Sequence, residues 1–168
     1  VKFRKYLNGG HQERNRRAGT ENVACIVGLA KALTIAYENL EENNNRTIEL
    51  RNYFINEIKK NIEGVKINGD LIKRLPGNIS ISFEFVEADN ILHELDEKGI
   101  YISTGSACTT GSIESSHVLK SIGLSDAVAH STIRISIGKY NSQEDMDYTI
   151  KCLIDVVDKL RKLSPLYC

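Results

Sequence analysis

Residues 76–83 read Pro-Gly-Asn-Ile-Ser-Ile-Ser-Phe, and this stretch decides the fold. A turn signal is followed by strict alternation of apolar residues and serine, which predicts a strand with one apolar face over residues 79–83. Alternation returns over residues 132–137, which read Thr-Ile-Arg-Ile-Ser-Ile. Short apolar runs at residues 65–67 and 100–102 predict two further strands, so the chain is expected to form a small sheet of short strands.

Helical periodicity surrounds these strands. Apolar residues recur at spacings of three and four in the remaining segments, and Thr20 is a candidate N-cap for the first of them. The first two of these segments are separated only by the polar residues 41–45, so they form either two helices or one long, bent helix. The predicted helices span residues 21–40, 48–62, 89–98, 116–122 and 142–163. Helices around short strands predict an α+β layer, with a sheet covered on one face by helices.

Composition excludes some classes of function but does not identify one. The chain has 168 residues, 41% of them hydrophobic, with 22 basic and 22 acidic side chains. It has no apolar run of about 18–20 residues, and its charged start is not followed by the apolar segment of a signal peptide. A cytoplasmic protein is therefore expected, and the charge balance argues against binding to nucleic acid or to a membrane surface.

The charge is unevenly distributed, however. Residues 1–22 carry six basic and two acidic side chains, a net charge of +4. Within them, Arg17 to Asn22 read Arg-Ala-Gly-Thr-Glu-Asn at the start of the first predicted helix. A helix N-terminus, a hydroxyl and nearby arginines are the groups that bind a phosphate. As a pattern this is weak, because a Thr before an amphipathic helix is more often simply a helix cap.

The four cysteines are widely spaced and form no Cys-x-x-Cys pair, so neither a disulfide framework nor a metal site is expected. Cys108 lies in a loop rich in Ser, Thr and Gly, residues 103–112, where an accessible thiol suits a nucleophile. The alternative is a buried, unreactive thiol, since free cysteines are usually buried. Cys25 and Cys152 lie in predicted helices and are interpreted as packing residues.

Arg134 is the one charged residue of the predicted strand at residues 132–137. It lies between Ile133 and Ile135, so its side chain is expected on the face opposite theirs. The planar guanidinium binds a carboxylate through two parallel hydrogen bonds, which makes Arg134 a candidate substrate-binding residue. An ordinary structural ion pair is the alternative.

Together, these motifs resemble the C-terminal part of the pyridoxal-phosphate-dependent cysteine desulfurases, which belong to the class V aminotransferase group. The resemblance covers almost the whole chain in order, and it is closest to the long-loop branch, because the histidine-rich cysteine motif of the short-loop branch is absent. The matching segments are GGHQER (9–14), RAGTEN (17–22), LPGN (75–78), STGSAC (103–108), SHVL (116–119), AHSTIR (129–134) and LRKLSPL (160–166).

This resemblance implies the C-terminal small domain of PLP fold type I. Residues 1–25 would end the large α/β domain, and residues 26–168 would form the small domain. It further implies that Cys108 attacks the sulfur of L-cysteine, leaving alanine and a persulfide. Arg134 would bind the substrate carboxylate, and Thr20 would contact the cofactor phosphate of the other subunit in a homodimer. The sulfur acceptor would be an iron–sulfur scaffold or another acceptor protein.

The sequence also departs from this family. The Schiff-base lysine of the family follows a Ser-x-His motif, and none of the lysines here occupies such a motif. The aspartate that pairs with the pyridine nitrogen and the histidine stacked on the ring are also missing. These 168 residues alone are therefore expected to be inactive and not to hold pyridoxal 5′-phosphate stably. Two alternatives stay open: a cofactor-free module for sulfur relay or docking, and a related PLP-dependent lyase acting on selenocysteine or cysteine.

Overall fold

The computed structural model describes residues 4–104, 115–165 and 167. Contacts divide the chain into two compact units, residues 1–41 and residues 42–168.

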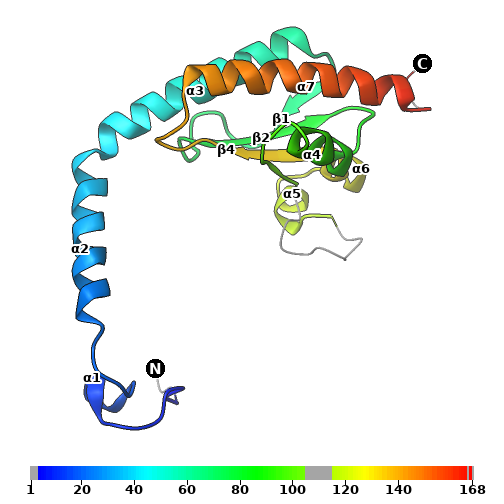
Figure 1. Cartoon of the computed structure of the whole chain (residues 1–168). Coiled ribbons are helices and arrows are strands. Elements are labelled where there is room, and N and C mark those ends of the chain that lie inside the picture. The colour runs from blue at the N-terminus through cyan, green and yellow to red at the C-terminus, as the bar shows by residue number, and fades with distance from the viewer. Residues whose placement is uncertain (1–3, 105–114, 166, 168) are drawn as a thin grey trace. The chain divides into compact units, whose positions relative to one another are not determined.

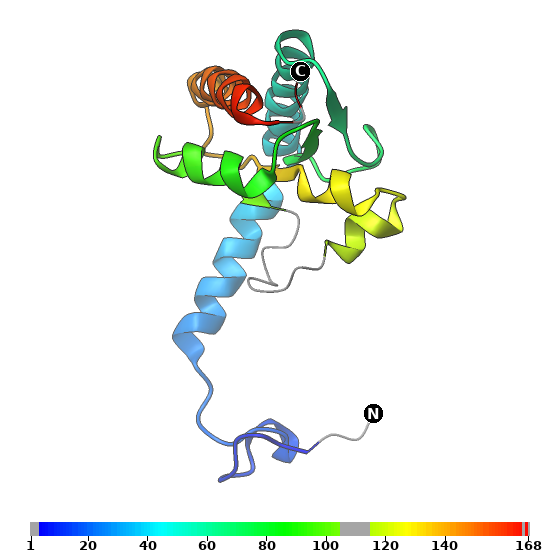
Figure 2. The same ribbon diagram turned by 90° about the vertical axis from the view of Figure 1, so that its right-hand side faces the viewer.

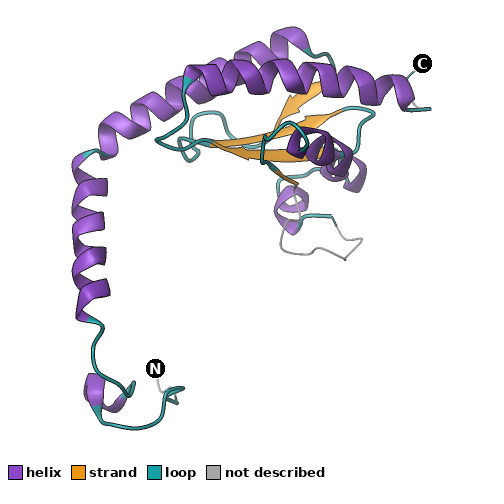
Figure 3. Ribbon diagram, viewed as in Figure 1, coloured by secondary structure: helices purple, strands orange, loops and turns teal. Residues whose placement is uncertain are grey.

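The second unit is built on a four-stranded antiparallel sheet in the order β1-β2-β4-β3. The strands are β1 (Val65–Ile67), β2 (Asn78–Phe83), β3 (Ser103–Thr104) and β4 (Thr132–Ser136). In the two central strands, Ile79, Ile81 and Ile133 are fully buried, which confirms the apolar face that the alternation predicts. Figure 3 shows these strands lying beneath two long helices.

Those two helices are α3 (Leu40–Asn61) and α7 (Gln143–Leu163), and they lie on the same side of the sheet in both views (Figures 1 and 2). Phe54 of α3 and Leu153 of α7 are fully buried against the isoleucines of the sheet. A capping box begins α7, because the Ser142 hydroxyl accepts from the Asp145 amide and the Asp145 carboxylate accepts from the Ser142 amide. The unit is completed by α4 (Ala88–Asp96), α5 (His117–Ser121) and α6 (Asp126–His130).

Three details differ from the sequence prediction. The polar break at residues 41–45 is helical, because no Gly or Pro interrupts it, and the first two helices instead separate at Asn39. The short helix α6 was not predicted. Residues 100–102 are not a strand, since β3 pairs with β4 only through Ser103 and Thr104. A cavity of about 310 Å³ is lined by residues 99–102 and 135–137 together with residues of α3 and α7.

The first unit contains α1 (Gln12–Asn15) and α2 (Val23–Glu38). The short α1 is a tight turn in which Glu13, Arg14 and Asn15 all have positive φ. The predicted apolar helix α2 is present, but none of its residues is buried, and its large apolar side chains are 43–77% exposed. Cys25 is therefore exposed rather than packed, whereas Cys152 in α7 is buried as expected.

The prediction that Thr20 caps α2 is wrong. The N-cap is Asn22, whose side-chain oxygen accepts a hydrogen bond from the Cys25 amide at 3.1 Å. Among the described residues, no single helix is long and apolar enough to cross a membrane. The bent pair α2 and α3 meets that test only when taken together, by length and composition.

Candidate functional site

Arg134 lies on the face of the sheet opposite the isoleucine core. Its neighbours Ile133 and Ile135 are buried, while Arg134 itself is exposed. The sequence pattern predicted this placement because successive side chains of a strand point to opposite faces. The charged group is thus held on a rigid central strand with its guanidinium accessible to a ligand.

The neighbours of Arg134 across the sheet are small hydroxyl residues. Ser80 of β2 and Ser103 of β3 both pair directly with Arg134, so the three side chains share one face. Arg134 Nη2 donates to Ser103 Oγ at 3.5 Å. These serines leave space around the guanidinium and offer hydroxyls beside it, which suits a small carboxylate ligand.

One side of this polar face is closed by a hydrogen-bonded chain. Asn68 Nδ2 donates to Ser82 Oγ at 2.8 Å, and Ser82 and Thr132 are 3% and 1% exposed. The Thr132 hydroxyl donates to the Val128 carbonyl at 2.6 Å, so the 2.7 Å contact between Ser82 and Thr132 has Ser82 as its donor. Ser82 and Thr132 are thus buried with their hydroxyl groups hydrogen-bonded. Arg134 is the first exposed residue along β4.

Cys108 lies outside the described residues, but both flanks of its segment, residues 105–114, are described. On one side Ser103 and Thr104 pair with β4. On the other side the Ser115 hydroxyl donates to the Asp126 carboxylate, and Lys120 Nζ lies 2.9 Å from the same oxygen. These two contacts, the Ser115 hydrogen bond first, lower the pKa of Asp126. The last described residue before this segment, Thr104, pairs with Ile133, the neighbour of Arg134 in β4.

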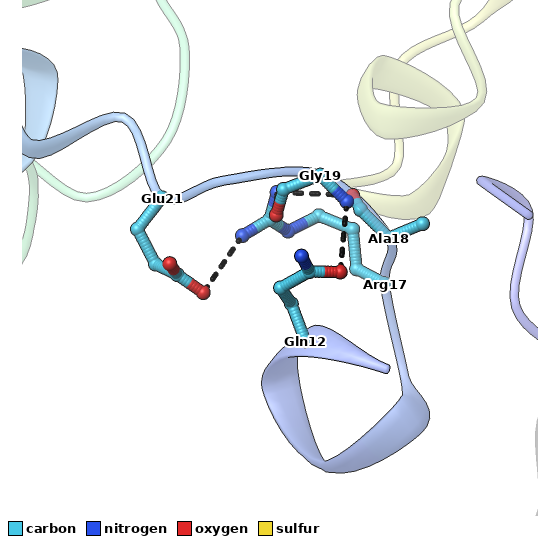
Figure 4. Close-up of polar contacts among 5 residues, drawn as sticks. All are labelled: Gln12, Arg17, Ala18, Gly19 and Glu21. Carbon is cyan, nitrogen blue, oxygen red and sulfur yellow. Dashed lines mark hydrogen bonds and ion pairs between the residues drawn. The ribbon is translucent and has the colours of Figure 1, made fainter. Parts of the chain in front are cut away.

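Thr20 lies in the first unit, in the loop before α2. It is exposed, and its hydroxyl is not used to cap α2, because Asn22 has that role. The backbone before it is held by two side chains, Gln12 and Arg17 (Figure 4). Thr20 thus presents a hydroxyl on a loop that carries net positive charge.

The sequence pattern did not predict three residues at these sites: Ser80 and Ser103 beside Arg134, and Gln12 behind Thr20. It pointed to Arg17 only as a possible phosphate-binding cation, whereas Arg17 holds the backbone before Thr20. The serines follow from strand alternation once the register is known, whereas Gln12 gives no local signal because its partner is seven residues away.

Comparison with known proteins gives the family of this chain. The family model described as Aminotransferase class-V matches residues 2–149, and the chain belongs to that family.

Within this family, the chain is similar to cysteine desulfurases, which confirms the resemblance seen in the motifs. It is 46% identical over 165 residues to the cysteine desulfurase IscS of Dictyoglomus turgidum, covering 98% of this chain and 42% of that relative. It is 42% identical to a cysteine desulfurase of a Nostoc species, covering 98% of this chain and 41% of the relative.

Solved structures agree with these relatives. A NifS-like protein matches 93% of this chain and 39% of its own length, with a TM-score of 0.78 and 34% identity. The NifS-like protein from Rickettsia africae matches 94% and 41%, with a TM-score of 0.79 and 29% identity. The predicted α+β fold is therefore confirmed, and the chain spans about two fifths of the length of the relatives it matches.

Proposed function

We propose that these 168 residues are the C-terminal portion of a cysteine desulfurase, called the parent below, which converts L-cysteine to L-alanine. The observation that carries this proposal is the 46% identity with a cysteine desulfurase over 98% of the chain. In this assignment residues 1–25 end the large domain, residues 26–168 form the small domain, and the parent acts as a homodimer in the cytoplasm.

Cys108 is proposed as the nucleophile. Its thiolate attacks the sulfur of the substrate, so that an S–S bond forms as the C–S bond breaks, and the released carbon takes a proton to become the methyl group of alanine. The sulfur then remains on Cys108 as a persulfide. An iron–sulfur scaffold or another acceptor protein would receive it.

The cofactor implied by the family is pyridoxal 5′-phosphate, which supplies an electron sink for breaking the C–S bond. Two groups of this chain fit the proposed complex. The exposed Thr20 hydroxyl suits the phosphate of a cofactor held by the other subunit, and the exposed Arg134 suits the substrate carboxylate. No lysine of this chain occupies the family's Schiff-base motif, so the 168 residues alone are expected not to hold the cofactor stably.

The surface of α2 supports a larger parent. An apolar helix is normally packed against other parts of its protein, but no residue of α2 is buried. Its exposed apolar residues are Val23, Ile26, Val27, Leu29, Leu33, Ile35 and Tyr37. We expect the rest of the parent to cover them.

The test compares the parent with the 168-residue chain, each supplied with pyridoxal 5′-phosphate and L-cysteine. The parent is expected to release alanine and to carry one extra sulfur atom, measured by intact mass. The chain alone is expected to do neither. Alanine release by the chain alone, or its absence with the parent, would overturn the proposal. Release from selenocysteine but not from cysteine would identify a selenocysteine lyase instead.

Substitution of Arg134 tests its role in binding the carboxylate. In the parent, Arg134→Ala is expected to raise the KM for L-cysteine about 10- to 100-fold, because a charge-assisted hydrogen-bonded pair is lost. Arg134→Lys keeps the charge but not the planar fork, and is expected to give an intermediate KM. Lys66→Ala, which removes an exposed cation from the same face of the sheet, is the control. An unchanged KM in Arg134→Ala would exclude this role.

A further inference from the structure

The loop before Thr20 is fixed by side chains rather than by regular secondary structure. Its backbone turns through three positive-φ residues, Glu13 to Asn15. Gln12 then reaches across the turn, and its Oε1 accepts a hydrogen bond from the Gly19 amide at 3.2 Å. Gly10 lies against the same side chain, since a Cβ on it would come within 2.5 Å of Gln12 Oε1.

Arg17 holds the same backbone from its carbonyl side. Its Nη1 donates to the Ala18 carbonyl at 3.2 Å and to the Gly19 carbonyl at 3.1 Å (Figure 4). Its Nη2 lies 3.7 Å from the Glu21 carboxylate. The Gly19 carbonyl belongs to the peptide bond that leads into Thr20, so Arg17 contacts the chain on both sides of that residue.

These contacts change the interpretation of the arginines in the basic start of the chain. Arg17 is one of the cations that suggested an anion site, but its Nη1 is occupied by two carbonyls and its Nη2 faces a carboxylate. It is therefore poorly placed to bind a phosphate itself. What it fixes is the backbone next to an exposed hydroxyl.

We infer that Gln12 and Arg17 are positioning residues that hold Thr20 in place for the phosphate group of a cofactor bound by another subunit. The inference rests on the proposed function and deepens it. Gly19, with φ of 93°, has a conformation that other residues rarely adopt, and Gln12 and Arg17 bind the amide and the carbonyls that flank this position. Without them the loop has alternative conformations, and the hydroxyl no longer lies in one place.

The test is a double-mutant cycle in the parent, read out as the dissociation constant for pyridoxal 5′-phosphate. Thr20→Ala and Arg17→Ala are each expected to weaken binding about 10-fold, through loss of a hydrogen bond to a charged group. The double variant is expected to bind no more weakly than Thr20→Ala alone, because Arg17 acts through Thr20. Arg16→Ala is the matched control, an exposed neighbour whose side chain makes no hydrogen bond or ion pair within the described part of the chain.

Gln12→Met removes the hydrogen-bond acceptor but keeps the length of the side chain. Combined with Thr20→Ala, it provides a second double-mutant cycle if Arg17→Ala does not fold. The thermal midpoint of each cofactor-free variant shows whether folding is intact. Additive losses in the cycle, or an equal loss in Arg16→Ala, would overturn the inference. Alanine release by the wild-type parent is measured alongside, so that failure of the proposed function is recognised separately.

Discussion

Replacing Cys108 by alanine in the parent is expected to lower sulfur transfer from L-cysteine about 1,000-fold or more, because the nucleophile itself is lost. In the proposed reaction the Cys108 thiolate forms the S–S bond that replaces the C–S bond. Binding of the cofactor and the KM set by Arg134 are expected to stay close to wild type. Persulfide on the protein is measured by intact mass, and alanine is measured in the absence of added thiols, which could take over the attack.

Cys25→Ala is the control for this substitution. Cys25 lies on α2, outside the segment that carries Cys108, so its replacement tests whether loss of any thiol lowers turnover. It is expected to keep wild-type turnover. Full alanine production by Cys108→Ala without added thiol would contradict the assignment and favour a lyase that needs no cysteine.

The faces of the sheet could be predicted from the sequence, but the partners across it could not. The period of two along a strand is fixed by the backbone, so the exposure of Arg134 between two buried isoleucines followed from the residues alone. The position of Ser103 beside Arg134 depends on the register between β3 and β4. That register is set by pairing between segments about thirty residues apart, which local patterns do not encode.

The start of α2 shows a different limit. Thr20 and Asn22 are both common N-cap residues, and Asn ranks somewhat above Thr in that position. The structure selects Asn22, which frees the Thr20 hydroxyl. The turn at Glu13 to Asn15 gave no signal, because residues other than glycine rarely adopt positive φ. Contacts such as Lys5 Nζ to Asn15 Oδ1 at 2.9 Å hold this turn, and they join residues ten apart.

The motif Leu-Pro-Gly-Asn at residues 75–78 has a physical explanation at Gly77. The Ile137 amide donates to the Gly77 carbonyl at 2.9 Å, which extends the β2–β4 pairing by one step. A Cβ on Gly77 would lie only 2.0 Å from the Ile137 carbonyl oxygen and 3.1 Å from Thr47 Cγ2. Only glycine permits this approach, because the first obstacle is backbone, which cannot rotate away as a flexible side chain could.

Gly77→Ala in the 168-residue chain is therefore expected to lower the free energy of unfolding by about 3 kcal/mol, the upper range for overpacking a well-packed site. The thermal midpoint would fall by roughly 6–12 °C. Gly138→Ala is the matched control, since a Cβ there meets nothing within 4 Å, and it is expected to change stability by less than about 0.5 kcal/mol. Equal stability of Gly77→Ala and wild type in urea unfolding would show that the two backbones are not held this closely. Asn78, next to Gly77, pairs with Ser136, which is two residues beyond Arg134 in β4. Strain at Gly77 is therefore expected to shift the strand that carries the Arg134 guanidinium as well.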